Sequence, residues 1–204
     1  MRADMKSETG LRPEVLYDPA EMTPHQRILD VAGMLFCRDG IHATGVDRIM
    51  TQAGASKMTL YSRFGSKEAL VRAVLVEEGG EWRRRFFAAL DAVPNPQARL
   101  ERVVSALADW FRGEGFYGCA FMNAVAEHTK GEAWLRALAA EHHGAILAYL
   151  GAQAEAAGYA EPALLARQLL LLIDGMIAAY MVSGDDAVLT VAQRSLDAIL
   201  AASR

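Results

Sequence analysis

Hydrophobic residues recur every three or four positions after residue 27 and predict one buried helix face: Ile28, Val31, Ala32, Leu35 and Phe36. The residues Thr-Pro-His-Gln at 23–26 form a helix start. Threonine can cap the helix, proline suits its first position, and glutamine can reach back to complete a capping box. We expect this first helix to end at Gly40.

Shorter helices are predicted after Gly40. Three hydroxyl residues can cap them and mark their starts: Thr44, Ser56 and Ser66. The helix after Thr44 is interrupted by Gly54, and the one after Ser56 runs to Phe64. Two short helices on either side of a tight turn at 53–55 predict a helix-turn-helix arrangement. An ordinary helical hairpin would show the same local pattern.

Helical periodicity continues almost unbroken to the C-terminus and predicts further helices at 66–92, 97–113, 119–128, 131–157, 161–183 and 185–202. Alternating runs rich in Val, Thr and Ile are absent, so we expect an all-α protein. Gly79 and Gly80 interrupt the first of these helices and suggest a flexible point. Residues 1–22 are polar and aperiodic, which predicts a flexible N-terminal arm.

The segment at 161–183 is apolar enough to resemble a membrane span. It carries Arg167, Gln168 and Asp174, which a lipid-facing helix would accommodate poorly. We therefore interpret it as a buried helix of a soluble protein. The chain begins without an apolar signal segment, and Cys37 and Cys119 lack CxxC spacing. Both features favour a reducing, cytoplasmic location.

The charge distribution favours nucleic acid more than the net charge of −4 does. Residues 23–76 carry seven basic and four acidic side chains, whereas the rest of the chain is acidic. A locally basic segment on an acidic body is typical of a DNA-binding module joined to a regulatory body.

The helix after Ser56 divides into two faces at 100° per residue. Leu60 and Phe64 lie four apart and are expected to face the core. The residues expected to contact DNA bases or phosphates are Thr44, Ser56, Lys57, Met58, Thr59, Tyr61, Ser62, Arg63 and Lys67. Hydroxyls can bond base edges, methionine can touch a thymine methyl, and cations, tyrosine and helix N-termini can meet phosphates. Any one of them alone is equally consistent with ordinary solvent exposure.

The stretch TGVDRIMTQAGASKMTLYSRFGSKEALV resembles the DNA-binding region of TetR-family transcriptional repressors. The positions that match the family pattern are Thr44, Ala53, Gly54, Ser56, Lys57, Leu60, Tyr61, Phe64, Ser66, Lys67, Glu68 and Leu70. Met58 departs from it, because the family very often has glycine there.

The resemblance implies an all-α homodimer acting on a palindromic operator. A helix-turn-helix domain at 23–70 would read DNA, and residues 71–204 would bind a ligand and dimerise. It also implies that the ligand tilts the long helix after Ser66. The helices at 161–183 and 185–202 are the expected dimer surface, since Gly175, Ala178 and Ala179 allow close approach. A fully internal helix is the alternative.

An apolar pocket is expected near residues 111–128, where TetR-like proteins have a similar GCxFxNAxAE stretch. The candidate lining residues are Trp110, Phe116, Tyr117, Phe121, Met122, Met176 and Tyr180, with Asn123 to orient a ligand. Core packing is the alternative for each of them.

Metal and enzyme chemistry are not indicated. Glu127-His128 and Glu141-His142 are adjacent pairs, whereas di-metal bundles use Glu-x-x-His. We therefore expect no metal and no cofactor. The sequence also lacks a nucleophile–base set and a phosphate loop. The resemblance to TetR-family repressors implies a repressor released by a small, hydrophobic effector. The alternative is a helical ligand-binding protein or enzyme whose hairpin does not bind DNA.

Overall fold

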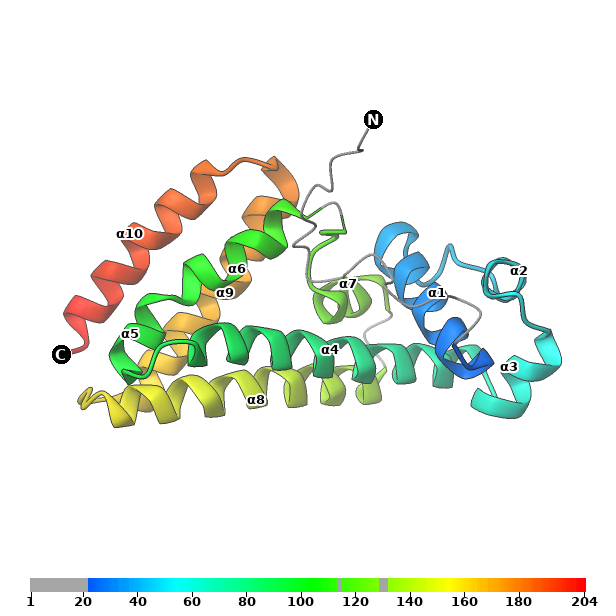
Figure 1. Cartoon of the computed structure of the whole chain (residues 1–204), viewed down its shortest axis with the longest axis horizontal. Coiled ribbons are helices and arrows are strands. Elements are labelled where there is room, and N and C mark those ends of the chain that lie inside the picture. The colour runs from blue at the N-terminus through cyan, green and yellow to red at the C-terminus, as the bar shows by residue number, and fades with distance from the viewer. Residues whose placement is uncertain (1–21, 114, 129–131) are drawn as a thin grey trace, which may run out of the picture. The chain divides into compact units, whose positions relative to one another are not determined.

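The computed structural model describes residues 22–113, 115–128 and 132–204, and every regular element in these ranges is a helix (Figure 1). The helices are α1 (Pro24–Asp39), α2 (Val46–Ala53), α3 (Lys57–Phe64), α4 (Lys67–Asp91), α5 (Pro96–Glu101), α6 (Val103–Arg112), α7 (Ala120–Glu127), α8 (Ala133–Ala156), α9 (Pro162–Ser183) and α10 (Ala187–Ala202). The prediction of an all-α fold is confirmed. Of the predicted arm at 1–22, residues 1–21 lie outside the described residues.

Most predicted helix starts are correct. The Thr23 hydroxyl accepts a hydrogen bond from the Gln26 backbone N–H, and the Gln26 side chain accepts one from the Thr23 N–H, which completes the capping box. Ser56 accepts from the backbone N–H of Thr59 at 3.1 Å, and Ser66 caps α4 in the same way. Each bond spans three residues, which is why the local sequence predicted it.

The predicted cap at Thr44 is wrong. Gly45 is the N-cap of α2, and the Thr44 side chain is fully buried. Its hydroxyl donates to the backbone carbonyl of Gly40 at 2.7 Å. The loop between α1 and α2 folds back, so the hydroxyl satisfies a carbonyl at the end of α1 instead of an N–H at the start of α2.

The turn between α2 and α3 depends on Gly54, which has a φ of +59° and the left-handed conformation that glycine adopts without steric cost. Leu60 is fully buried, as expected. Phe64 is half-buried, and its ring stacks on His25 at the surface of α1 with 4.8 Å between centroids. Figure 1 shows α1, α2 and α3 grouped around this turn.

The helix predicted at 97–113 is divided into α5 and α6. Arg102 separates them, with φ −86° and ψ −4°. Its backbone N–H bonds the carbonyls of both Ala98 and Arg99, at 3.2 Å each, so the helix tightens before it continues.

Packing divides the described chain into two compact units. The N-terminal unit comprises residues 22–84 and 117–146, and the C-terminal unit comprises residues 85–116 and 147–204. Helices α4 and α8 contribute to both. The predicted boundary at residue 70 falls inside α4, so the division into a DNA-binding and a ligand-binding domain stays a prediction.

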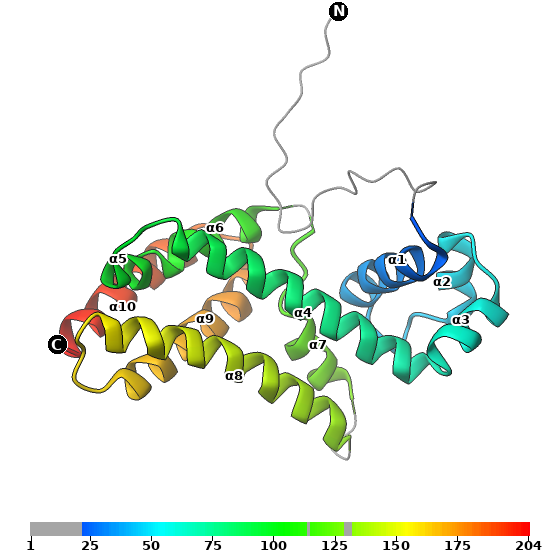
Figure 2. The same cartoon turned by 60° about the horizontal axis from the view of Figure 1, so that its bottom comes forward.

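Each unit buries its own apolar side chains. The N-terminal unit is built around Ile28, Leu35, Ile49, Leu60, Leu70, Val74, Phe121 and Leu135. In the C-terminal unit α9 packs against α6 and α10, which both views show side by side with α9 (Figures 1 and 2), and these helices bury Leu107, Leu169 and Leu196.

Helix α9 is the single helix in the described residues that is long and apolar enough to cross a membrane, judged by length and composition alone. Its inner face is buried and includes Leu165, Leu169, Ile173, Met176 and Ile177. The core helix of a soluble protein passes the same test, so this property is weak support for a membrane span.

Candidate functional site

Helix α3 presents an exposed polar face on a core-anchored helix. Met58 is 80% exposed and Tyr61 is 53% exposed. Lys57, Ser62 and Arg63 are exposed as well, and Thr59 is half-buried. The structure therefore brings the predicted contact residues of α3 together on one short helix, and buried Leu60 fixes the helix to the core.

The hydroxyls of α3 already have local partners. Ser56 and Thr59 share a hydrogen bond of 2.9 Å between their hydroxyl oxygens. Ser62 donates to the backbone carbonyl of Thr59 at 3.0 Å. Hydroxyls accept as well as donate, so these side chains keep hydrogen-bonding capacity for a partner that approaches α3.

Cations around α3 are held in exposed ion pairs. Lys57 pairs with Asp47 at 2.5 Å. Asp39 pairs with Arg38 and Arg48, at 2.8 Å each, and their guanidinium groups lower the pKa of the Asp39 carboxyl. Exposed ion pairs contribute little to stability, so phosphates can compete for these cations. The sequence analysis did not single out Arg38 and Arg48, because only folding places them in one cluster of charges.

Lys67 is not free to extend toward phosphate in this structure. Its ammonium donates to the backbone carbonyl of Ile41 at 2.6 Å, and burial lowers the pKa of this ammonium. The predicted contact residues Thr44 and Lys67 thus support the loop between α1 and α2 from within. The bond to Ile41 uses one of the three ammonium donors of Lys67, so its phosphate contact stays a prediction. Thr44 is fully buried.

Glu127, the last residue of α7, holds the same loop from another direction. Its carboxylate accepts a hydrogen bond from the His42 backbone N–H at 3.0 Å. A Cβ on Gly40 would lie 3.1 Å from this carboxylate, so the glycine permits the close approach. We call the contacts of Glu127 and Lys67 with residues 40–42 the loop clamp. Sequence analysis missed it, since Glu127 and His42 are 85 positions apart.

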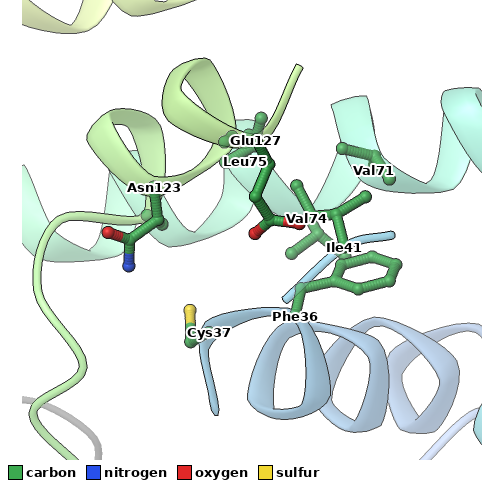
Figure 3. A pocket seen from close by; sticks show the side chains of 10 residues that line it. Phe36, Cys37, Ile41, Val71, Val74, Leu75, Asn123 and Glu127 are labelled. Carbon is green, nitrogen blue, oxygen red and sulfur yellow. The ribbon is translucent and has the colours of Figure 1, made fainter. Parts of the chain in front are cut away.

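A small cavity lies beside the loop clamp. It is lined by Phe36, Cys37, Ile41, Val71, Val74, Leu75, Ala120, Asn123, Ala124 and Glu127, and its volume is about 10 Å³. Figure 3 shows Glu127 reaching from α7 toward Ile41 and Phe36, with Asn123 farther along the same helix. A volume of this size holds about one water molecule and is too small for an effector. Asn123 donates to the carbonyl of Tyr117 at 2.7 Å, which fastens the segment before α7.

The predicted ligand-lining residues fall into two groups. Tyr117, Phe121, Met122 and Asn123 belong to the N-terminal unit. The others, Trp110, Phe116, Met176 and Tyr180, belong to the C-terminal unit. The eight residues are divided in this way because the chain passes from one unit to the other between Phe116 and Tyr117.

The C-terminal group packs closely. The Phe116 ring meets Trp110 at 5.1 Å and Tyr180 at 5.5 Å between centroids, both edge-on, which fits core packing. The Tyr180 hydroxyl donates to Asp186, which also pairs with Arg112 at 2.7 Å. This arrangement favours the packing alternative for these residues, and their ligand role stays a prediction.

A wider groove of about 330 Å³ runs between α8 and α9 in the C-terminal unit. Its lining residues are Leu147, Ala148, Gly151, Ala152, Glu155, Pro162, Ala163, Ala166 and Arg167. None of the predicted ligand residues is among them.

A buried cluster around His142 was also missed by sequence analysis. The His142 ring stacks on Phe121, with 4.2 Å between centroids and 19° between planes. Arg83 contacts its Nδ1 atom at 2.7 Å. Arginine can only donate, so Nδ1 must accept, and we infer a neutral imidazole with its proton on Nε2. Burial lowers the pKa of His142 to about 3, and the charges of Arg83 and His143 add to this effect.

The His142 pKa predicts a loss of stability in mild acid. The unfolded chain takes up the proton near pH 6.5 while the folded protein does not, so stability falls as the pH drops from 6.5 toward 3. Between pH 7.5 and pH 5.0 the free energy of unfolding should fall by about 2 kcal/mol more in the wild type than in His142→Gln. Urea unfolding at both pH values measures this, with the exposed His25→Gln as control. Equal losses in wild type and His142→Gln would contradict the assignment of a neutral imidazole.

Comparisons with known proteins agree with this geometry. Residues 28–74, which contain α2 and α3, match the family model described as bacterial regulatory proteins, tetR family. The chain is 29% identical over 85 residues to the HTH-type transcriptional regulator UidR of Escherichia coli (strain K12), a match covering 42% of this chain and 43% of UidR. It is 34% identical over 84 residues to the HTH-type transcriptional activator FasR of Mycolicibacterium smegmatis, covering 41% of this chain and 38% of FasR.

The chain thus spans less than half the length of these curated relatives. A solved structure matches more of the chain: a TetR-family transcriptional regulator from Streptomyces coelicolor has a TM-score of 0.81 and 29% identity, covering 88% of this chain and 95% of that one. The chain thus carries a tetR-family DNA-binding domain at residues 28–74, and its all-helical fold is similar to that of a TetR-family regulator over 88% of the chain.

Proposed function

We propose that this protein is a DNA-binding transcriptional regulator that acts as a homodimer on a palindromic operator. The observation that carries the proposal is α3, a short helix held by buried Leu60 that exposes Met58, Tyr61, Ser62 and Arg63 after a left-handed turn. This is the arrangement of a recognition helix, which enters the major groove and contacts base edges.

The contacts in the groove follow from the chemistry of the exposed face. Thr59 and Ser62 hydrogen-bond base edges, and Met58 contacts a thymine methyl group. Tyr61 and Arg63 reach phosphates on either side, and Lys57 exchanges Asp47 for a phosphate. Met58 occupies a position where the family often has glycine, so it contributes to the choice of operator.

The homodimer is proposed through α9 and α10. Three large apolar side chains lie on one side of α9 and are exposed: Leu164 (48%), Leu171 (74%) and Val182 (85%). Val191 of α10 is 63% exposed. Exposed apolar side chains of this size mark an association surface. A two-fold dimer would place two α3 helices in successive major grooves about 34–36 Å apart, on an operator with matching symmetry.

We further propose that the protein represses transcription in the cytoplasm and that a small, hydrophobic effector releases it from DNA. FasR is an activator, so a reporter gene under the operator, with and without the protein, decides the direction of control. Lower expression with the protein present is the expected result, and higher expression would contradict repression.

Tyr61→Ala should weaken operator binding about tenfold on every sequence, because it removes a phosphate contact that carries no base information. Fluorescence anisotropy with duplexes from the region upstream of the gene, across a range of salt concentrations, measures the affinity. Tyr117→Ala, an exposed tyrosine outside α3, serves as the matched control.

Sedimentation should find Tyr61→Ala in the same oligomeric state as the wild type. Unchanged affinity in Tyr61→Ala would mean that α3 does not lie on the duplex. If the wild type binds no duplex in a salt-sensitive, sequence-dependent manner, the proposed function fails as a whole.

A further inference from the structure

Helix α4 has a notch at Gly79 that is filled by an aromatic ring from α7. Gly79 is buried, and a Cβ built on it would lie 2.7 Å from Cε2 and 2.8 Å from Cζ of Phe121. The same Cβ would lie 3.1 Å from Nδ1 of His142 of α8, whose ring stacks on Phe121 with 4.2 Å between centroids. The two stacked rings thus both meet the bare backbone at Gly79, and we call the space that the Phe121 ring fills beside His142 the slot.

One edge of this slot carries the positive charge of Arg83. Arg83, one turn after Gly79 on α4, contacts the neutral His142 at 2.7 Å. Across residues 22–113, 115–128 and 132–204, no carboxylate lies within 4.0 Å of the Arg83 guanidinium, whereas the neighbouring Arg84 pairs with Glu81. A part-buried cation that faces only a neutral ring favours an anion beside it.

We propose that this slot is the effector site and that it binds a small aromatic carboxylate, whose ring takes the place of the Phe121 ring and whose carboxylate pairs with Arg83. The proposal rests on the proposed function, since it names the ligand class of the same regulator.

The chemistry of the slot selects such a ligand. Guanidinium and carboxylate form two parallel hydrogen bonds, a fork geometry that a neutral amide of the same shape does not reproduce. His142 and Trp82, whose rings lie 5.6 Å apart between centroids, provide aromatic surface for the ligand ring. The aryl group supplies the hydrophobic contact, and the charge supplies the selectivity.

Ligand entry is coupled to the DNA-binding helix α3 through α7. Phe121 lies near the start of this eight-residue helix, and Glu127 ends it. A ligand that expels the Phe121 ring shifts α7 and so disturbs the hydrogen bond from the His42 N–H to Glu127. That bond positions residues 40–42, which connect α1 to α2, so loss of the loop clamp changes the presentation of α3.

Isothermal titration calorimetry without DNA tests the ligand class. The probes are benzoate, cinnamate and 1-naphthoate, each compared with its neutral amide. We expect at least one acid to bind wild-type protein about tenfold or more tightly than its amide. Arg83→Gln should remove this preference for acid over amide. Arg83→Lys should keep part of it, and Arg84→Gln, the matched control, should keep all of it.

Binding of none of the three acids would overturn the proposal, as would acid binding with an undiminished acid preference in Arg83→Gln. If Arg83→Gln does not fold, Arg83→Lys decides instead. A reduced preference for acid over amide is expected there, and an undiminished preference would overturn the proposal. Adding the bound acid to the protein–operator complex should raise the operator dissociation constant. If the protein binds acid and its operator affinity does not change, the effector role is overturned. If the protein binds acid but binds no operator even without ligand, the proposed function is contradicted instead.

Discussion

Leu171→Glu is expected to convert the dimer into monomers. Operator affinity should then fall about a hundredfold or more, because a monomer loses the avidity of two linked DNA-binding domains. Leu171 is 74% exposed on the side of α9 that also carries Leu164 and Val182. The two-fold axis of a dimer brings two copies of this surface together, so the variant would bury two like charges without partners. Sedimentation velocity measures the mass, and fluorescence anisotropy measures the affinity.

Val76→Glu is the matched control for the dimer test. Val76 is 53% exposed on α4, in the N-terminal unit and outside α9 and α10. Val76→Glu also replaces an exposed apolar side chain by glutamate, and it should leave both the mass and the operator affinity close to the wild-type values. A Leu171→Glu protein that remains dimeric would show that the exposed face of α9 is not the association surface.

Gly79→Ala and Gly80→Ala are expected to change stability in opposite directions. Alanine at 79 would place a methyl group 2.7 Å from the buried Phe121 ring and 3.1 Å from Nδ1 of His142, on which that ring stacks. Overpacking of this kind costs about 1–3 kcal/mol. Nothing lies within 4 Å of a Cβ at 80, so alanine there should add about 0.5–1 kcal/mol through helix propensity.

Urea unfolding of the two variants measures the difference. The positions are neighbours inside one helix, so the propensity gain is the same for both and the difference isolates the contact with Phe121. Stabilisation of both variants to the same extent would mean that the notch at Gly79 does not hold the Phe121 ring in solution.

Local sequence predicted the helix starts whose bonds lie within one turn. The capping box of Thr23 and the caps at Ser56 and Ser66 each join residues three apart, and the left-handed turn needs only Gly54. Leu60 was also placed correctly, because helical spacing alone determines which side of a short helix faces the core.

The features that the sequence did not predict have a common physical cause, which is a partner outside the helix that the local pattern defines. Thr44 was taken as a cap, yet its hydroxyl bonds the end of the preceding helix. Lys67 was assigned to phosphate, which stays a prediction, and the sequence did not show that its ammonium bonds a carbonyl 26 residues earlier. Gly79 was interpreted as part of a flexible point, yet it is buried beneath a ring from α7. Periodicity predicts which side of a helix is apolar, but it does not predict which helix packs against that side.

The ligand site illustrates the same limit. Phe121 was selected from its aromatic neighbours along the chain, whereas Arg83 and His142 were not selected as a pair because 59 positions separate them. Their chemistry appears only when α4, α7 and α8 lie together in the N-terminal unit.

Selection of binding sites from a random duplex pool by the wild-type protein tests the central claim most directly, namely that two copies of α3 read DNA. The enriched sequences should share an inverted repeat whose half-sites are centred about 34–36 Å apart, one turn of the double helix. A pool without any enriched sequence, or enrichment of a single half-site by a protein that sediments as a dimer, would contradict it.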